Sequence, residues 1–128
     1  MFGKKLRELR QEAGLLIKHL AKEANLSIVY VSDMERERRD PPKKEHIRLF
    51  CKALESRLGY FPEDLFSAAD IDRGRIEISL EQVSPQRQEV YLRLARIIDQ
   101  ISDEDLECFV NQLEQKAKEG RSYISVLG

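Results

Sequence analysis

Long apolar runs are absent from the sequence, and no stretch approaches the roughly 20 residues that span a bilayer. The first ten residues, MFGKKLRELR, lack the apolar segment of a signal peptide, so a cytoplasmic protein with no membrane partner is expected. The sequence also contains no glycine-rich phosphate loop, no nucleophile–base signature and no metal-ligand cluster. We therefore expect neither an enzyme nor a protein that holds a cofactor or a metal.

Cysteine is scarce, with two residues, Cys51 and Cys108, that lie far apart in the chain. Neither belongs to a Cys-x-x-Cys pair or a Cys/His cluster, which argues against a disulfide and against a metal site. Both fall in stretches of helical apolar periodicity, so the pattern favours two small buried side chains.

Charge is unevenly distributed, although the whole chain of 128 residues carries a net charge of only −1. Residues 1–60 contain 14 Lys/Arg and 9 Asp/Glu, a balance of +5, whereas residues 61–128 contain 8 and 14, a balance of −6. A basic half beside an acidic half suggests that only the first half meets a polyanion such as nucleic acid. A modest excess of this size also arises from chance clustering on solvated faces.

Helical periodicity dominates the first 70 residues and predicts five helices. Apolar stripes recur at helical spacing in segments 4–14, 17–25, 27–36, 43–58 and 61–69. Gly14 and Gly59 suit the left-handed position that ends a helix, and Ser27 suits the N-cap of the third. Asn25 ends the second helix, because asparagine tolerates left-handed backbone angles.

The second half of the chain predicts one strand and two helices. Ile76, Ile78 and Leu80 alternate with polar residues, which is the pattern of a strand that needs a partner. Helices are expected after Ser84-Pro85 and after the acidic SDED at 102–105, the latter ending at Gly120. Together they would form an antiparallel hairpin whose apolar stripes are wider than two short helices can bury. The tail 121–128, RSYISVLG, is apolar and β-prone.

The connection between the second and third helices is short, because it consists of residues 25–27 alone. Such a tight connection between apolar anchors is the layout of a helix-turn-helix. Ala21 permits a close approach of the two helices, and Leu26 would fill the turn. Val31 and Met34 would hold the third helix against the core.

A resemblance to a known family rests on the run LRELR…AGL…LAKEANLSIVYVSDMER.RRDPP. The agreeing positions are Gly3, Leu6, Leu9, Arg10, Gly14, Leu20, Ala21, Leu26, Ser27, Tyr30, Val31, Ser32, Met34, Glu35, Arg39 and Pro41. With these positions in register, residues 3 to about 66 resemble the Cro/cI-repressor, or Xre, family of DNA-binding domains. The resemblance implies a mainly α fold, a five-helix lambda-repressor-like helix-turn-helix domain, followed here by the helical hairpin with its short β-strand. It also implies a buried pair between Arg10 and Glu35 that ties the first helix to the third.

Three departures from the family pattern concern the DNA-facing surface. Leu16 and Ile17 replace the Ser-Gln whose glutamine contacts a phosphate in the family. Glu37 replaces a glycine after the third helix and can enter left-handed space only at a cost. The reading positions carry apolar side chains and an acid, Asp33.

The resemblance nevertheless implies DNA binding through the third helix and the segment that follows it. The expected DNA-binding residues are Ser27, Ile28, Val29, Tyr30, Ser32, Asp33, Arg36, Arg38, Arg39 and Lys43. Ile28 and Val29 can contact thymine methyl groups, and Asp33 can accept from a cytosine amino group. The basic residues would contact phosphates, which give most of the affinity.

Other interpretations of the same residues stay open. Arg36 to Arg39 could form a solvated, charge-laced turn, because acids are interleaved among the arginines. Tyr30 could pack against the fourth helix instead of facing DNA. The pair Ile28-Val29 could be an apolar patch for a protein partner.

Most members of the family act as dimers, and the second half supplies the candidate dimer contacts. The expected dimerisation residues are Ile76, Ile78, Val90, Leu94, Ile97, Phe109, Val110 and Leu113. We expect a DNA-binding domain over residues 1–70 and a dimerisation region over residues 71–128, with a single monomeric core as the alternative. The leading hypothesis is a transcriptional regulator, a homodimeric repressor that binds double-stranded operator DNA through helix 27–36. The alternative is a protein-interaction module, such as an antirepressor or an antitoxin whose acidic half covers a basic toxin.

Overall fold

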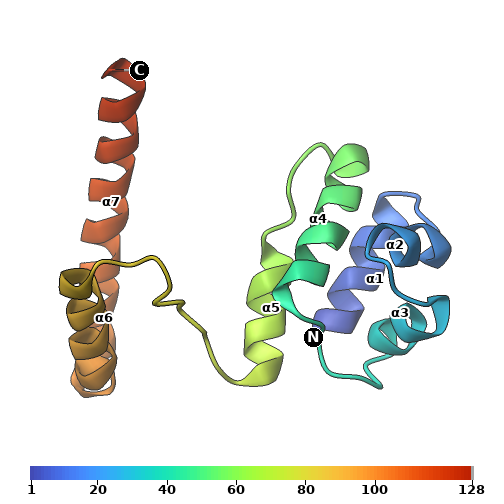
Figure 1. Cartoon of the computed structure of the whole chain (residues 1–128), viewed down its shortest axis with the longest axis horizontal. Coiled ribbons are helices and arrows are strands. Elements are labelled where there is room, and N and C mark those ends of the chain that lie inside the picture. The colour runs from blue at the N-terminus through green and yellow to red at the C-terminus, as the bar shows by residue number, and fades with distance from the viewer. Residues whose placement is uncertain (128) are drawn as a thin grey trace. The chain divides into compact units, whose positions relative to one another are not determined.

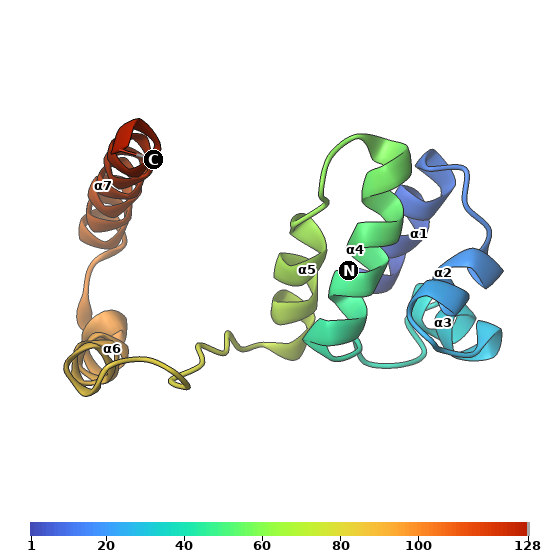
Figure 2. The same ribbon diagram turned by 45° about the horizontal axis from the view of Figure 1, so that its top comes forward.

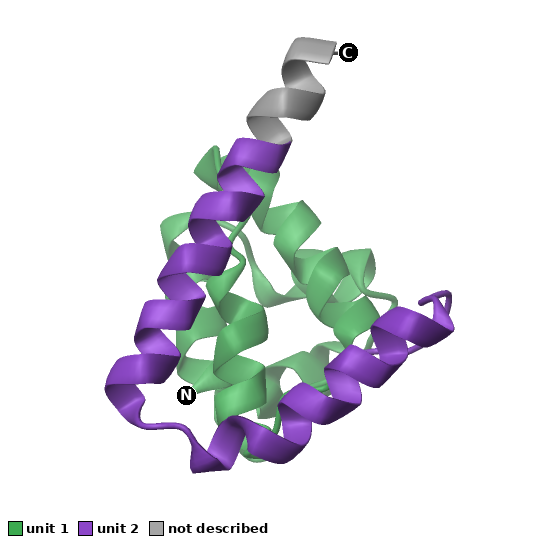
Figure 3. Ribbon diagram, turned by 90° about the vertical axis from the view of Figure 1, so that its left-hand side faces the viewer, with its two compact units in different colours: residues 1–78 green, residues 79–128 purple. Residues whose placement is uncertain are grey.

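The protein is mainly helical, as predicted, and its computed structural model describes the backbone of residues 1–127 and the side chains of residues 1–120. The chain divides into two compact units, unit 1 (residues 1–78) and unit 2 (residues 79–128), which Figure 3 distinguishes by colour. No helix in this described part is long and apolar enough to cross a membrane.

Unit 1 consists of five helices, which confirms the predicted number. They are α1 (Phe2–Glu12), α2 (Ile17–Glu23), α3 (Ile28–Glu35), α4 (Lys44–Leu58) and α5 (Asp64–Arg73). α1 contacts both α3 and α5, and α2 packs on α3 and α4 (Figures 1 and 2). α5 extends to Arg73, past residue 69 where the predicted segment ends, and is capped by Gly74.

The predicted helix ends are confirmed by the backbone angles. Gly14, Asn25 and Gly59 have φ values of 69°, 56° and 82°, all in the left-handed region. Ser27 caps α3, because its hydroxyl accepts a hydrogen bond from the Tyr30 N–H at 3.1 Å. These caps fix the bounds of the helices that carry the functional surface.

A single apolar core lies inside unit 1. Its members come from all five helices, and the largest fully buried side chains are Phe2, Phe50, Leu6, Leu20, Met34, Ile47, Leu54, Leu65, Val31 and Cys51. Every buried residue among residues 1–120 lies before residue 70. Unit 1 is therefore a folded domain with its own core, which is what positions α3.

Unit 2 contains α6 (Pro85–Ile97), a short 3₁₀ turn η1 (Ile98–Gln100) and α7 (Asp103–Leu127). The predicted caps are confirmed, because Ser84 Oγ accepts from the Arg87 N–H and Ser102 Oγ from the Asp105 N–H, both at 3.2 Å. The two helices follow each other in the predicted order, but they diverge from their connection instead of packing along their lengths (Figure 3).

The predicted short strand at residues 76–81 is wrong. Residues 75–80 form an open segment, and no strand occurs anywhere in residues 1–127. The physical reason is that an alternating segment becomes a strand only when a neighbour accepts its backbone hydrogen bonds. The bounds of α7 also pass Gly120, where the sequence predicts its end. The side chains of the tail 121–128, to which the sequence assigns a part in dimerisation, lie outside the described residues.

Candidate nucleic-acid interface

The turn between α2 and α3 has the geometry that the sequence predicts. Asn25 adopts a φ of 56°, and the Leu26 N–H donates to the Ala21 carbonyl at 2.8 Å, which closes the turn. Ala21 is buried where α2 and α3 approach each other. A larger side chain at this position would hold the two helices apart. The turn therefore sets α3 at a fixed position on α2.

Burial divides α3 into two faces. Val31, Met34 and Glu35 are buried against the core. On the opposite side, Ile28 is 54% and Val29 is 69% exposed, so two adjacent apolar side chains face outward. α3 thus presents a firmly held helix with an outward apolar tip.

A buried ion pair ties α3 to α1 and confirms what the resemblance implies. Arg10 Nε donates to Glu35 Oε2 at 2.7 Å and its Nη2 donates to Glu35 Oε1 at 3.0 Å. The remaining guanidinium nitrogen donates to the Leu15 carbonyl at 3.0 Å. Because the Glu35 side chain is only 3% exposed, this two-pronged pair fixes the register of α3 against α1.

Comparison with known proteins agrees with this geometry. Residues 1–56 match the family model described as a helix-turn-helix domain. Over these residues the chain is similar to helix-turn-helix domains. The chain is also 53% identical over 66 residues to the HTH-type transcriptional regulator DdrOP3 of Deinococcus deserti, which covers 52% of this chain and 47% of that protein. The chain thus spans about half the length of this curated relative.

A solved complex of the SinR and SinI proteins matches more of the chain at lower similarity. The match covers 92% of this chain and 99% of the other, with 18% identity and a TM-score of 0.41. The assignment of the helix-turn-helix domain rests on α1–α3 and on the family match, not on this likeness.

The segment after α3 holds the helix-turn-helix domain together at a second point. Glu37 adopts a φ of 58°, the strained conformation expected where the family has glycine. Its carboxylate accepts from the Met1 amine and from the Lys4 N–H, and the hydrogen bond from that amine holds the Glu37 pKa below its usual range. Gly3 allows this contact, because a Cβ there would overlap the Met34 carbonyl oxygen.

Arg36, Arg38, Arg39 and Lys43 lie at the end of α3 and in the loop that follows it. Of the ten predicted DNA-binding residues, seven are exposed: Ser27, Ile28, Val29, Arg36, Arg38, Arg39 and Lys43. Tyr30, Ser32 and Asp33 are half-buried. Tyr30 packs against the core, yet one side of its ring remains available to a neighbour.

One contact near α3 has no signal in the sequence. The Arg39 guanidinium lies 4.7 Å from the centre of the Tyr30 ring, and its Nε lies 3.6 Å from Asp33 Oδ2. Arg39 is thus held by a ring face and a carboxylate together. Asp33, predicted as an acceptor for cytosine, already has a charged partner in the free protein.

The predicted dimerisation residues are all exposed in the single chain. They are Ile76, Ile78, Val90, Leu94, Ile97, Phe109, Val110 and Leu113. Among residues 79–120 no side chain is buried, so α6 and α7 have no apolar core of their own. These residues therefore form apolar surfaces that neither unit covers within itself.

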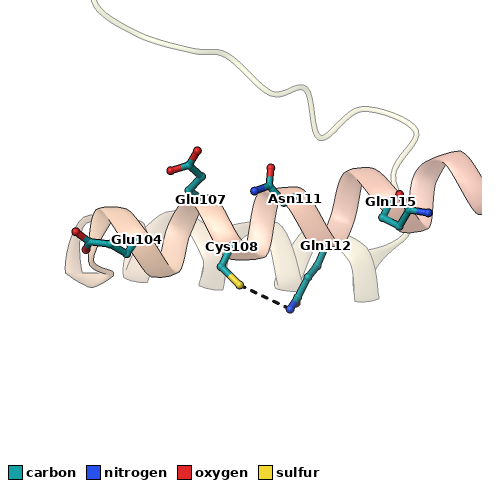
Figure 4. A pocket seen from close by; sticks show the side chains of 6 residues that line it. All are labelled: Glu104, Glu107, Cys108, Asn111, Gln112 and Gln115. Atoms are coloured by element: carbon teal, nitrogen blue, oxygen red, sulfur yellow. Dashed lines mark hydrogen bonds between the residues drawn. The ribbon is translucent and has the colours of Figure 1, made fainter.

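The face of α7 opposite Phe109, Val110 and Leu113 is polar and carries the exposed Cys108 (Figure 4). Its other members are Glu104, Glu107, Asn111, Gln112 and Gln115, and the Gln112 amide lies 3.8 Å from the Cys108 sulfur. The prediction that both cysteines are buried is right for Cys51 and wrong for Cys108, because the helix turns Cys108 away from the apolar stripe. Within the described residues no cluster of His, Cys, Asp or Glu could hold a metal.

Proposed function

We propose that the protein is a DNA-binding regulator of transcription that inserts α3 into the major groove. The proposal is supported by one observation: α3 is fixed on its buried face and exposed on its outer face. The buried Arg10–Glu35 pair fixes α3, while Ile28 and Val29 stand exposed at its start. A helix fixed in this way can meet base edges without losing further conformational freedom.

The side chains divide into those that hold DNA and those that read it. Arg36, Arg38 and Lys43 are exposed cations beside α3 and would contact phosphates. Ile28 and Val29 would contact thymine methyl groups, and Ser27 and Ser32 could donate to the backbone or to bases. Affinity would then be mostly electrostatic, and base preference would depend on apolar contacts.

Arg39 and Asp33 act as a unit in this proposal. The carboxylate of Asp33 and the ring of Tyr30 hold the Arg39 guanidinium in one place. Asp33 would therefore orient Arg39 toward DNA, and it could accept from a cytosine amino group only by releasing that arginine. Asp33→Ala should weaken binding less than Arg39→Ala, because Arg39 retains its charge.

A dimer is part of the proposal, because one helix-turn-helix domain reads a short half-site. Unit 2 supports it through its exposed apolar faces, which have no core to join. Covering the exposed half of one large apolar side chain contributes about 1 kcal/mol, so the six predicted contact residues of unit 2 together offset part of the cost of association. A dimer on an operator would compete with RNA polymerase, so we propose repression.

DNA binding is tested by measuring duplex affinity across salt concentrations. Arg36→Glu combined with Arg39→Glu should weaken binding to every sequence and lower the salt dependence of log K by about 2 per bound copy. Lys52→Glu combined with Arg57→Glu is the matched control, since both residues are exposed on α4 in the same unit. Equal affinity of both variants would refute the assignment of the interface to α3.

Base reading requires a separate measurement on a library of duplexes. Val29→Ala should change the preference among sequences while leaving the salt dependence intact. A uniform loss over the whole library would contradict a reading role for Val29.

A second candidate function is favoured by the exposure of Ile28 and Val29. The same apolar tip could bind a protein, as in an antirepressor or an antitoxin. In that case the arginines after α3 could be neutralised without effect, and no salt-dependent retention on duplex DNA would occur. A basic protein that copurifies with the chain through its acidic second half would favour the antitoxin interpretation.

The dimer is tested by sedimentation at micromolar concentration, where a mass of only 14.9 kDa would contradict it. Leu94→Asp should shift the protein toward the monomer, because it places a charge in the apolar face of α6. Arg93→Asp, one position away on the same helix, is the control and should leave the mass unchanged.

A further inference from the structure

The segment 75–81 between α5 and α6 has the sequence RIEISLE and carries the most exposed aliphatic side chains among residues 61–120. Ile76 is 78% and Ile78 is 68% exposed. In the described part of the chain, no acceptor contacts the backbone N–H groups of residues 76–80. The segment therefore offers both an apolar edge and free backbone donors, which is what a strand without a partner offers.

We propose that this segment pairs with the same segment of a second copy as a two-stranded antiparallel ribbon centred on Ile78. The inference rests on the proposed dimer and names one of its contact surfaces. In this register Ile78 faces its own counterpart, and Ile76 faces Leu80 of the second copy. All three apolar side chains of each strand then lie on one face of the ribbon, because strand side chains alternate.

Charge selects this register over its neighbours. With Ile78 at the centre, Arg75 faces Glu81 of the second copy, and Glu77 faces Ser79. Moving the centre to Glu77 places two glutamates opposite each other, and moving it to Ser79 places Glu77 opposite Glu81. Like charges directly opposite are destabilising, so a two-residue shift in either direction is disfavoured. Parallel pairing in register is also disfavoured, because it places Glu77 and Glu81 beside the same glutamates of the second copy.

The existing hydrogen bonds are compatible with the pairing. The Lys44 ammonium donates to the Glu77 carbonyl at 3.2 Å, so this carbonyl already has a partner. If Ile76, Ile78 and Leu80 form the hydrogen-bonded positions, the Glu77 carbonyl points away from the second strand. The Leu80 carbonyl accepts from the Gln88 amide at 3.2 Å and from the Val83 N–H at 3.3 Å, and in the ribbon the second of these bonds would be exchanged for one from the N–H of Ile76 of the other copy.

Unit 1 provides a place for the apolar face of the ribbon. A shallow hollow of about 540 Å³ is lined by Ile71, Gly74 and Ile76, together with Ser67, Asp70 and Arg75. Ile71 is exposed there although it lies on α5 beside the core. Leu80 of the second copy, facing Ile76, would extend this apolar surface, which an isolated two-stranded ribbon needs for stability.

The pairing sets the distance between the two helix-turn-helix domains. Four residues separate Gly74 from the centre at Ile78, and a strand rises about 3.3 Å per residue, so each α5 would end roughly 13 Å from the axis. The two ends would thus lie about 26 Å apart. This is the scale of the spacing of half-sites, which is about 34 Å for one DNA turn.

Single-cysteine cross-linking tests the register in the full chain carrying Cys108→Ser. Under mild oxidation Ile78→Cys should cross-link with itself, since facing strand residues lie within disulfide reach. Ile76→Cys and Leu80→Cys should each remain uncross-linked alone, because each lies roughly 13 Å along the strand from its own copy. An equimolar mixture of these two variants should cross-link.

Two outcomes would overturn the ribbon. One is a dimer in sedimentation in which Ile78→Cys does not cross-link, and the other is equal cross-linking of all three variants alone. The first outcome leaves the proposed dimer and DNA binding intact, whereas a monomer at micromolar concentration would remove both the dimer and the ribbon. Because these positions are exposed, the substitutions should leave unit 1 folded, and circular dichroism checks this.

Charge reversal provides an independent measurement. Arg75→Glu should raise the Kd of the dimer roughly tenfold, because two opposite-charge pairs become like-charge pairs. Adding Glu81→Arg to the same chain should restore the Kd to within about threefold of the original. A double variant no better than Arg75→Glu alone would count against the register.

Discussion

Replacing Arg10 by methionine should destabilise unit 1 more than any single change on its surface. The substitution removes both hydrogen bonds to Glu35 and leaves a carboxylate whose side chain is only 3% exposed. Removing one partner of a buried pair costs about 3–5 kcal/mol, against a total stability of about 5–15 kcal/mol for a small domain. Arg10→Met should therefore increase the unfolded fraction of the domain without changing the surface proposed to bind DNA.

Removing the other partner of the pair, Glu35, should lower the stability by less. In Glu35→Leu the arginine loses its partner, but its side chain is 12% exposed and still donates to the Leu15 carbonyl at 3.0 Å. It can turn its charged end toward water, so we expect a loss near 3 kcal/mol. The double variant should recover most of the stability, to within about 1–2 kcal/mol of the original, because no charge remains buried.

Urea unfolding followed by circular dichroism measures all four proteins of this cycle. A loss of 3 kcal/mol corresponds to a midpoint shift of about 1–3 M for a typical slope. The surface pair of Lys5 and Asp64 is the control, and Lys5→Met should change stability by less than about 1 kcal/mol. If the losses of the two single variants simply added in the double variant, the two residues would not be coupled and the register argument would fail.

Further predictions concern glycine, the α3 cap and the two thiols. Gly3→Ala should lower the free energy of unfolding by more than about 2 kcal/mol, because α1 must move away from the Met34 carbonyl. Gly14→Ala has open space around it but a φ of 69°, so it should lower the free energy of unfolding by about 1 kcal/mol. Urea midpoints compare the two variants. Ser27→Ala should cost about 1 kcal/mol in the same assay, and no loss would refute the cap. Burial, with the charges of Glu55 and Glu63, raises the pKa of the Cys51 thiol from 9.0 to about 11. The protonated thiol therefore contributes to the stability of the fold below about pH 9, and this contribution is lost as the pH rises toward 11. Iodoacetamide at pH 8 should therefore modify one thiol per native chain, and Cys108→Ser should abolish the reaction; two modified thiols would contradict the burial of Cys51.

The ends of α1, α2 and α4 and the start of α3 could be predicted because the residues that end and begin these helices act locally. Gly14, Asn25 and Gly59 supply left-handed backbone angles, and Ser27 supplies a side-chain acceptor, whatever the rest of the fold does. The strand could not be predicted in the same way. The alternation of residues 76–80 specifies which side chains share a face, but it does not specify a backbone partner, and the single chain supplies none.

The candidate site was predictable in its outline and not in its contacts. The apolar spacing of α3 indicated which face is outward, and the exposures of Ile28 and Val29 agree with it. The pairing of Arg39 with Asp33 and Tyr30 depends on where the loop after α3 folds back, which no local pattern specifies. Cys108 was misassigned because an apolar stretch of helix also contains positions on its polar side.

All the described buried side chains lie before residue 70, and this has a thermodynamic consequence. Unit 1 can melt as a unimolecular transition whose temperature is independent of how much protein is present. Order in α6 and α7, by contrast, would follow mass action if a second copy covers them, and their melting temperature would rise with total chain concentration. Calorimetry over a dilution series would resolve two transitions. Under the proposed function, the occupancy of DNA sites would then depend on the amount of this chain that the cell makes.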